Sequence, residues 1–255
     1  MTDETLDRIS CEAMEPFGKG LSAFFEGRKD ATILVRRDDG YVAPMPAGYF
    51  FRAESQFSRM EQLALNRCHG RVLDVGAGTG MLTLPLQRKG HEVAALDICP
   101  YAVSIMNQRG VRTAFCGDIF EYRERPFDTV MLMGHGIGMV QSLHGLHIFL
   151  KHVRSLVADR GQILMDSLDV RLTSESVHLA YHERNRRLEK YIGEIGMQFE
   201  FDGMTGPFFG WLQVDPETLS ECAENEGWKC DVVLRELAGD YLAVLTRTPS
   251  KEGMK

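Results

Sequence analysis

Three glycines, Gly76, Gly78 and Gly80, occupy alternate positions in the stretch LDVGAGTG, directly after a short apolar run. Because glycine has no Cβ atom, the chain can turn tightly there and a ligand can lie directly against the backbone. A carboxylate, Asp97, follows at the end of the next apolar run. A carboxylate can accept two hydrogen bonds at once, and charge-assisted bonds of this kind are strong. These residues indicate a small-molecule site at the ends of two strands.

The spacing of the glycines separates the ligands that such a turn could bind. A dinucleotide-binding turn requires G-x-G-x-x-G, so its third glycine would stand where this chain has Met81. A phosphate-binding loop requires Lys followed by Ser or Thr after the glycines, and this pair does not follow here. The sequence therefore predicts a ligand that is not held through phosphates.

Short apolar runs alternate with helix-like segments through the middle of the chain, which is the order of a parallel sheet with helices on both faces. Such sheets bind ligands beyond the carboxyl ends of their strands. We therefore expect a doubly wound, Rossmann-like α/β fold with three layers, αβα. The predicted strands span 70–76, 91–97, 111–118, 127–134 and 161–167, and the clearest predicted helices span 100–110 and 139–159, with Gly161 in the turn after the second helix.

Composition and charge limit the partners of the chain. At 255 residues with 44% hydrophobic residues, it can bury a substantial core. Its formal net charge of -7 argues against nucleic acid or an anionic membrane as the main partner, because both are bound through dense Lys and Arg surfaces. The N-terminus is polar, and no apolar run approaches the ~20 residues of a membrane span. The six cysteines form no C-x-x-C pair, so we expect reduced thiols and a cytoplasmic protein.

The glycine stretch and the segments after it resemble the motifs of class I S-adenosylmethionine-dependent methyltransferases, in the same order. VLDVGAGTG is similar to the first motif, AALDICP to the second, CGDIF to the third and FDTVMLMGHGIGMV to the fourth. The resemblance extends over residues 70–168. It implies a seven-stranded, mostly parallel sheet, S-adenosyl-L-methionine as cofactor, and transfer of a methyl group to an oxygen or nitrogen of a small organic acceptor.

The resemblance also implies a role for each matching residue. It implies that Asp97 accepts hydrogen bonds from the ribose hydroxyls and that Ile98 covers one face of the adenine. It implies that Asp118 accepts from the adenine amine, and that Ile119 offers its backbone N–H to a ring nitrogen. Asp74 is then the acceptor for the ammonium group of the methionine moiety. The other cofactor-binding residues that it implies lie in the glycine turn and after the fourth strand, at Gly76, Ala77, Gly78, Gly80 and Gly134.

A general base is needed only if the acceptor loses a proton on methylation, as a phenol or an ammonium group does. His135 lies just after the fourth strand, where the resembled family brings cofactor and acceptor together. Asp166, at the end of the fifth strand, is the second candidate, and Tyr181 and His182 are weaker ones. Each of these side chains has an alternative role, which is to shape a loop or to pack against the cofactor.

The segments outside the resembled core are expected to cover the site within a single domain. Within residues 1–255 we expect an N-terminal cover at 1–65 and a cofactor-binding core at 66–169. An inserted helix with a β-hairpin follows at 170–214, and a C-terminal helix with two strands at 215–248. From the N-terminal cover, Tyr49 and Arg52 are expected to reach the cofactor. The stretch ATILVRRDDG in this cover predicts a strand and a turn whose purpose the sequence does not indicate.

The insertion carries the aromatic residues that could bind the acceptor. With His135, the predicted acceptor-binding residues are Tyr181, Phe208 and Trp211. An alternative is that the aromatic side chains pack the hairpin onto the sheet or form the contact of a homodimer.

Other functions fit the same fold. They are methylation of a protein or RNA chain, cofactor binding by a non-catalytic regulator, and NAD(P)-dependent oxidation, which the glycine spacing disfavours. We expect no metal, because no His, Cys or carboxylate cluster has the spacing of metal ligands.

Overall fold

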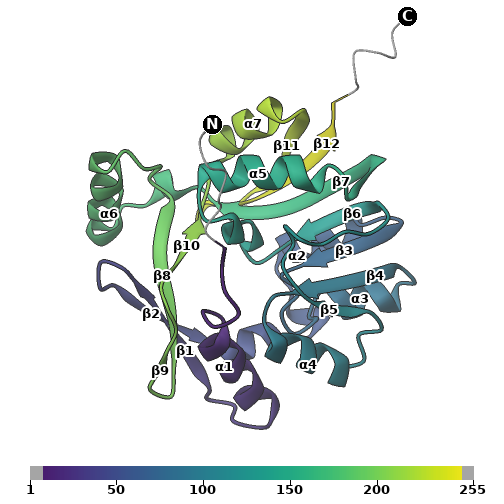
Figure 1. The fold of residues 1–255 in the computed structure, drawn as a ribbon, viewed down its shortest axis with the longest axis horizontal. Helices are drawn as coiled ribbons and strands as arrows, with labels where there is room; N and C mark the ends of the chain where they lie inside the picture. The colour runs from purple at the N-terminus through teal and green to yellow at the C-terminus, as the bar shows by residue number, and fades with distance from the viewer. Residues whose placement is uncertain (1–7, 249–255) are drawn as a thin grey trace, which may run out of the picture.

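A seven-stranded sheet forms the core of the chain in the computed structural model, with the strand order β11-β12-β7-β6-β3-β4-β5 (Figure 1). The structure describes residues 8–248, so most of the polar N-terminus discussed above lies outside the described residues. The strands are β3 (Arg71–Val75), β4 (Glu92–Asp97), β5 (Ala114–Cys116), β6 (Phe127–Leu132), β7 (Val157–Leu168), β11 (Trp228–Arg235) and β12 (Asp240–Arg247).

The pairing of these strands confirms the predicted fold class. Strands β7, β6, β3, β4 and β5 are paired in parallel, and β12 runs antiparallel to both of its neighbours. The helices that follow or precede them are α2 (Arg59–Arg67), α3 (Thr83–Arg88), α4 (Pro100–Gln108), α5 (Leu143–Val153) and α7 (Pro216–Asn225). The carboxyl ends of the parallel strands therefore meet at one edge of the sheet.

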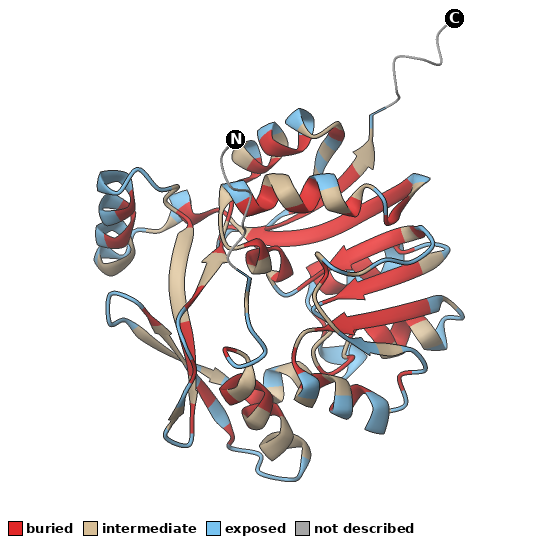
Figure 2. Cartoon of the chain, viewed as in Figure 1, coloured by how far each residue is buried: buried red, intermediate tan, exposed pale blue. Residues whose placement is uncertain are grey.

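Both faces of the sheet are covered, as the run of buried residues in its central strands shows (Figure 2). In β3, Val72 packs in one apolar cluster with Met60 of α2. The next residue, Leu73, belongs to a second cluster that contains Phe149 of α5. Because successive side chains of a strand point to opposite faces, α2 and α5 lie on opposite sides of the sheet.

The predicted helix over 139–159 is wrong in its extent. The structure has a short 3-10 helix, η3 (Gly136–Val140), before α5, and β7 begins at Val157, so that Gly161 lies inside a strand rather than after a helix. The helix begins late because the side chain of Ser142 caps its first turn. It ends early because Val157 already pairs with the first residue of β6. The apolar periodicity of the sequence indicates neither the late start of α5 nor its early end.

A second, antiparallel sheet joins the N-terminal cover to the insertion. Its order is β10-β8-β1-β2, with β9 paired to β8. Leu34 of β1 is the register partner of Glu200 of β8, so the N-terminal strand whose purpose the sequence does not indicate pairs with a strand of the insertion. The strands are β1 (Thr32–Arg37), β2 (Val42–Pro46), β8 (Glu194–Phe201), β9 (Met204–Thr205) and β10 (Phe209–Leu212).

Two helices flank this second sheet. Helix α1 (Glu15–Phe25) packs on it through Phe17, whose ring centroid lies 5.1 Å from that of Phe199 in β8. Helix α6 (Ser176–Arg187) lies at its outer end (Figure 1). Within residues 8–248, no helix is both long and apolar enough to cross a membrane.

Candidate active site

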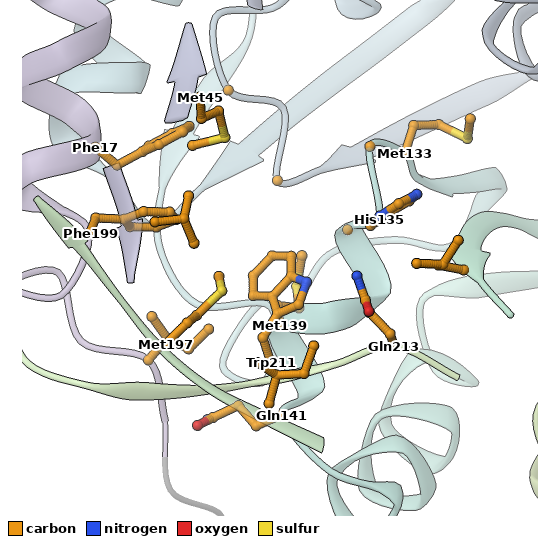
Figure 3. A pocket seen from close by; sticks show the side chains of 18 of the residues that line it. Phe17, Met45, Met133, His135, Met139, Gln141, Met197, Phe199, Trp211 and Gln213 are labelled. Carbon is orange, nitrogen blue, oxygen red and sulfur yellow. The ribbon is translucent and has the colours of Figure 1, made fainter. Parts of the chain in front are cut away.

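A cavity of about 800 Å³ lies where the carboxyl ends of the central strands face the second sheet. Gly76, Asp97 and His135 line it from the central sheet, and Met197 and Trp211 line it from β8 and β10. Figure 3 shows side chains from both sheets turned toward this space. The fold therefore brings the predicted cofactor turn and the predicted acceptor cover to one cavity.

The three glycines of the turn all have left-handed backbone conformations, with φ of 69° at Gly76, 57° at Gly78 and 74° at Gly80. A Cβ atom added at Gly78 would meet no atom within 4 Å, and the residue lines the cavity, so a side chain there would occupy ligand space. Gly80 does not line the cavity. A Cβ atom there would lie 2.8 Å from Val111, so Gly80 is required for close packing instead.

Asp97 ends β4 and is buried at the cavity wall. Its two carboxylate oxygens accept the backbone N–H groups of Gly78 at 2.7 Å and Cys99 at 2.8 Å. Burial raises the pKa of Asp97 above its usual range, while these two hydrogen bonds act in the opposite direction. The carboxylate is thus held rigidly between the glycine turn and the start of α4, with oxygen lone pairs left for ligand hydroxyls.

Asp74 ends the apolar run of β3 and lies on the cavity wall. The hydroxyl of Thr83 donates to it at 2.5 Å. Burial raises the pKa of Asp74 to about 6, the negative charge of Asp97 adds to the shift, and the hydrogen bond from Thr83 opposes it. A cationic ligand group beside Asp74 would remove the penalty of this buried charge.

The predicted adenine-binding residues Ile98, Asp118 and Ile119 also line the cavity. Oδ1 of Asp118 accepts the backbone N–H of Phe120 at 2.9 Å, and the guanidinium of Arg8 lies 3.4 Å from Oδ2. The structure therefore places this carboxylate at the cavity wall, beneath the N-terminal segment.

Of the two residues expected from the N-terminal cover, only Tyr49 lines the cavity. Arg52 lies behind it. Its guanidinium is 2.6 Å from Glu61 and stacks over the ring of Tyr49 at 3.8 Å. This ion pair turns Arg52 away from the cavity, and the residue supports Tyr49 rather than lining the site.

His135 has the left-handed conformation, with φ of 59°, and lines the cavity. Its backbone N–H donates to Oδ1 of Asp166 at 2.9 Å, and its Nε2 lies 2.8 Å from Oδ1 of Asp240. Burial lowers the pKa of His135, but the hydrogen bond with Asp240 and the charges of Asp166 and Asp240 outweigh it and raise the pKa above 6.5. The hydrogen bond with His135 also lowers the pKa of Asp240.

Asp166 does not line the cavity, because it is buried behind the backbone of His135. Burial raises its pKa to about 6, against the opposing effects of the charge of His135 and of backbone hydrogen bonds. Its carboxylate holds the strained backbone of His135 in place. Asp166 is therefore a positioning residue in this structure, and the side chain that contacts the imidazole is Asp240.

The predicted acceptor-binding residues are separated by the fold. Trp211 and Tyr181 line the cavity, and the hydroxyl of Tyr181 donates to Asp38 at 2.8 Å. Phe208 is half exposed and lines a neighbouring hollow instead, because it lies in the loop before β10. Only a part of the aromatic segment therefore faces the cavity.

Trp211 packs directly against η3, the segment that follows His135. A Cβ atom added at Gly138 would lie 2.0 Å from the indole of Trp211, so only glycine fits there. Met139 of the same segment also lines the cavity, near Gly76. This contact links the cofactor turn, η3 and the second sheet.

The sequence did not predict several residues of the cavity wall, most of which are apolar. These are Phe17, Met45, Met139, Met197, Phe199 and Gln213 (Figure 3). The alternation of Met197 with Phe199 in β8 is a signal for one side of a strand, but it does not indicate what that side faces. Asp240 was missed because no motif marks the start of the last strand. Among the described residues, no group of three or more His, Cys, Asp or Glu side chains could hold a metal ion.

Comparison with known proteins agrees with this geometry. Residues 51–231, more than half of the chain, match the family model described as a methyltransferase domain. The crystal structure of a SAM-dependent methyltransferase from Bacteroides fragilis, in complex with S-adenosyl-L-homocysteine, has a TM-score of 0.82 and 30% sequence identity. This match covers 95% of this chain and 98% of that chain.

Two curated proteins match shorter segments. An uncharacterized methyltransferase of Staphylococcus carnosus (strain TM300) is 37% identical over 76 residues, which is 29% of this chain and 37% of that protein. The magnesium-protoporphyrin O-methyltransferase of Rhodobacter capsulatus is 36% identical over 69 residues, which is 25% of this chain and 31% of that protein. The chain therefore matches only about a third of the length of these curated relatives.

Proposed function

The chain belongs to the family of S-adenosylmethionine-dependent methyltransferases, and we propose that it methylates an oxygen or a nitrogen of a small organic acceptor. S-adenosyl-L-methionine is its cofactor. The observation that carries the proposal for the acceptor is the cavity itself. It joins the glycine turn and His135 to an apolar wall supplied by the second sheet.

The residues of the glycine turn and the neighbouring strand ends fit this cofactor. Gly78 leaves ligand space that any side chain would fill, and the buried carboxylates of Asp97 and Asp74 suit two hydroxyls and an ammonium group. When bound, S-adenosylmethionine supplies a methyl group on a positively charged sulfur, which a nucleophile can displace in line. The protein's own task is then to align the acceptor and to exclude water.

His135 is suited to remove a proton from the acceptor. Because its Nε2 is paired with Asp240, Nε2 carries the proton of the neutral imidazole. Nδ1 then has a free lone pair that can take up a proton. Nδ1 has no hydrogen-bond partner among the described residues. A proton taken up at Nδ1 creates an imidazolium that the carboxylate of Asp240 stabilises. Asp240 and Asp166 act through His135 as positioning residues.

The elements that surround the cavity favour a small acceptor over a protein or RNA chain. The second sheet, α1 and α6 all contribute residues to its wall, for example Phe17, Val35 and Tyr181. A chain-like acceptor requires an open groove, and RNA would also require a basic surface, which a net charge of -7 does not favour. All six cysteines are free thiols, which supports action in the reducing cytoplasm.

Transfer of labelled methyl groups tests the proposal. The purified protein is incubated with S-adenosylmethionine labelled at the methyl group and with a cell extract separated by size into small molecules, protein and nucleic acid. The proposal predicts label in products of the small-molecule fraction. Label in protein or nucleic acid instead would replace the small acceptor with a macromolecular one. Cofactor binding with no transfer to any fraction would indicate a non-catalytic regulator.

A further inference from the structure

The imidazole of His182 is a buried polar group that the proposed reaction does not use. His182 lies on α6, is only 6% exposed and lines the cavity. It has no hydrogen-bond or ion-pair partner within residues 8–248. Buried polar side chains in folded proteins nearly always have a partner, so an unpaired one in a cavity wall is available to a ligand.

The polar residues around His182 are already paired with each other. Nδ1 of His178 lies 3.0 Å from Arg37, and Nε2 of His178 lies 3.5 Å from Glu175. Arg37 in turn holds Asp39 through two hydrogen bonds of 2.8 Å and 2.6 Å. The side chain of His182 takes part in none of these pairs, so its hydrogen-bonding capacity is unused.

The charges that act on His182 are positive. Burial lowers its pKa, and the basic side chains of Arg186, His178 and Arg37 lower it further. These basic groups and the carboxylates on the neighbouring elements pair with one another, Arg37 with Asp39, Arg184 with Asp38, and Arg186 with Glu183 at 3.6 Å. Glu175 lies beside His178. A negatively charged ligand group would find a hydrogen-bond donor at His182, with basic side chains as the charged groups that act on it most strongly.

We propose that His182 binds a carboxylate of the acceptor, on the α6 side of the cavity, while the reacting hydroxyl or amine of the same molecule lies at His135. This inference rests on the proposed function and adds a substrate class to it. The wall of the same cavity also contains Met139, Met197 and Trp211, and their sulfur and aromatic surfaces suit a flat apolar body (Figure 3). The acceptor class is thus an aromatic or otherwise apolar carboxylic acid.

Binding of matched probes tests this inference without any turnover. The probes are 4-hydroxyphenyl alkanoates of increasing length, from the acetate to the pentanoate, each compared with its own methyl ester. Their affinities are measured by calorimetry on the full-length protein saturated with S-adenosyl-L-homocysteine. The variants are His182→Leu and, as the matched control, His144→Leu, which changes an exposed histidine that does not line this cavity.

We expect the best carboxylate to bind at least tenfold more tightly than its ester. In His182→Leu this difference should disappear, while the ester and S-adenosyl-L-homocysteine bind within twofold of the wild type. His144→Leu should leave the preference intact. The inference is overturned if no carboxylate binds better than its ester, if no probe of either kind binds, or if His182→Leu weakens both kinds equally. Failure of the proposed function would appear separately, as label in a macromolecular fraction or no methyl transfer at all.

Discussion

Nε2 of His135 lies 2.8 Å from Oδ1 of Asp240, a contact between residues that are 105 positions apart in the chain. His135 follows β6, and Asp240 begins β12, on the other side of β7 in the sheet. The contact fixes which nitrogen of the imidazole carries the proton, and it leaves the other nitrogen without a hydrogen-bond partner among the described residues. The proposed chemistry depends on this arrangement.

The first prediction concerns the titration of His135. The hydrogen bond with Asp240 and the nearby negative charges raise its pKa above 6.5 despite burial, so its NMR titration should have a midpoint above 6.5 in the wild type. In Asp240→Asn the midpoint should fall. A midpoint that is the same in both proteins would contradict the assigned contact.

The raised pKa of His135 also predicts how the stability of the protein changes with pH. Because the pKa of His135 is raised in the folded state, the stabilisation by its charged pair is fully present below the unfolded value of about 6.5. It is lost as the pH rises through the folded value. Asp240→Asn should therefore lower the melting temperature more at pH 6 than at pH 9. Equal losses at both pH values would show that the pair contributes no charge-dependent stability.

The second prediction concerns Asp97. Asp97→Ala removes the carboxylate that the structure holds between Gly78 and Cys99, so the affinity for S-adenosyl-L-homocysteine should fall at least tenfold, or about 1.4 kcal/mol. Calorimetry measures this loss. Asp159→Ala is the matched control, because Asp159 has a side chain that is 97% exposed. Its affinity should equal that of the wild type, and an equal loss in both variants would contradict the assignment.

The third prediction concerns the pH dependence of cofactor binding. Asp74 must be ionised to accept a hydrogen bond from an ammonium group, and burial raises its pKa to about 6. The affinity for S-adenosyl-L-homocysteine should therefore decrease as the pH falls from 7 to 5. Asp74→Asn should bind more weakly at pH 7 and should lack most of this dependence. An unchanged pH profile in Asp74→Asn would place the ammonium group elsewhere.

The fold class and the cofactor turn could be predicted because their determinants are local. Glycines at alternate positions and an acidic residue at the end of the next strand are features of a short stretch, and Gly76 and Asp97 line one cavity in the structure. The alternation of apolar runs also predicts the parallel sheet, since buried strands need no long-range information to be recognised.

The acceptor side could be predicted only in part, because its contacts are between distant segments. The pairing of Leu34 with Glu200 follows from no local signal, and neither does the contact between His135 and Asp240. Arg52 was expected at the cofactor because of its place in the sequence, but Glu61, nine residues later, holds it behind Tyr49. Ion pairs of this kind depend on the final fold and leave no motif.

The fourth prediction concerns the contact between η3 and β10. Gly138→Ala places a Cβ atom 2.0 Å from the indole of Trp211, so the ring must shift, at a cost of roughly 1–3 kcal/mol. The melting temperature should fall and the tryptophan fluorescence should change. Gly117→Ala is the control, because its Cβ atom would lie 3.7 Å from Leu96, an ordinary contact. Equal stability of the two variants would contradict the close packing of Trp211 on η3.

His135 is proposed to remove the acceptor's proton in a cavity shared with the cofactor. The most direct test compares wild type with His135→Gln, using the small-molecule fraction that accepts label from the wild type. We predict a loss in methyl transfer of roughly 100-fold or more, with the affinity for S-adenosyl-L-homocysteine within a few-fold of the wild type. Methyl transfer by His135→Gln at close to the wild-type rate would contradict the claim.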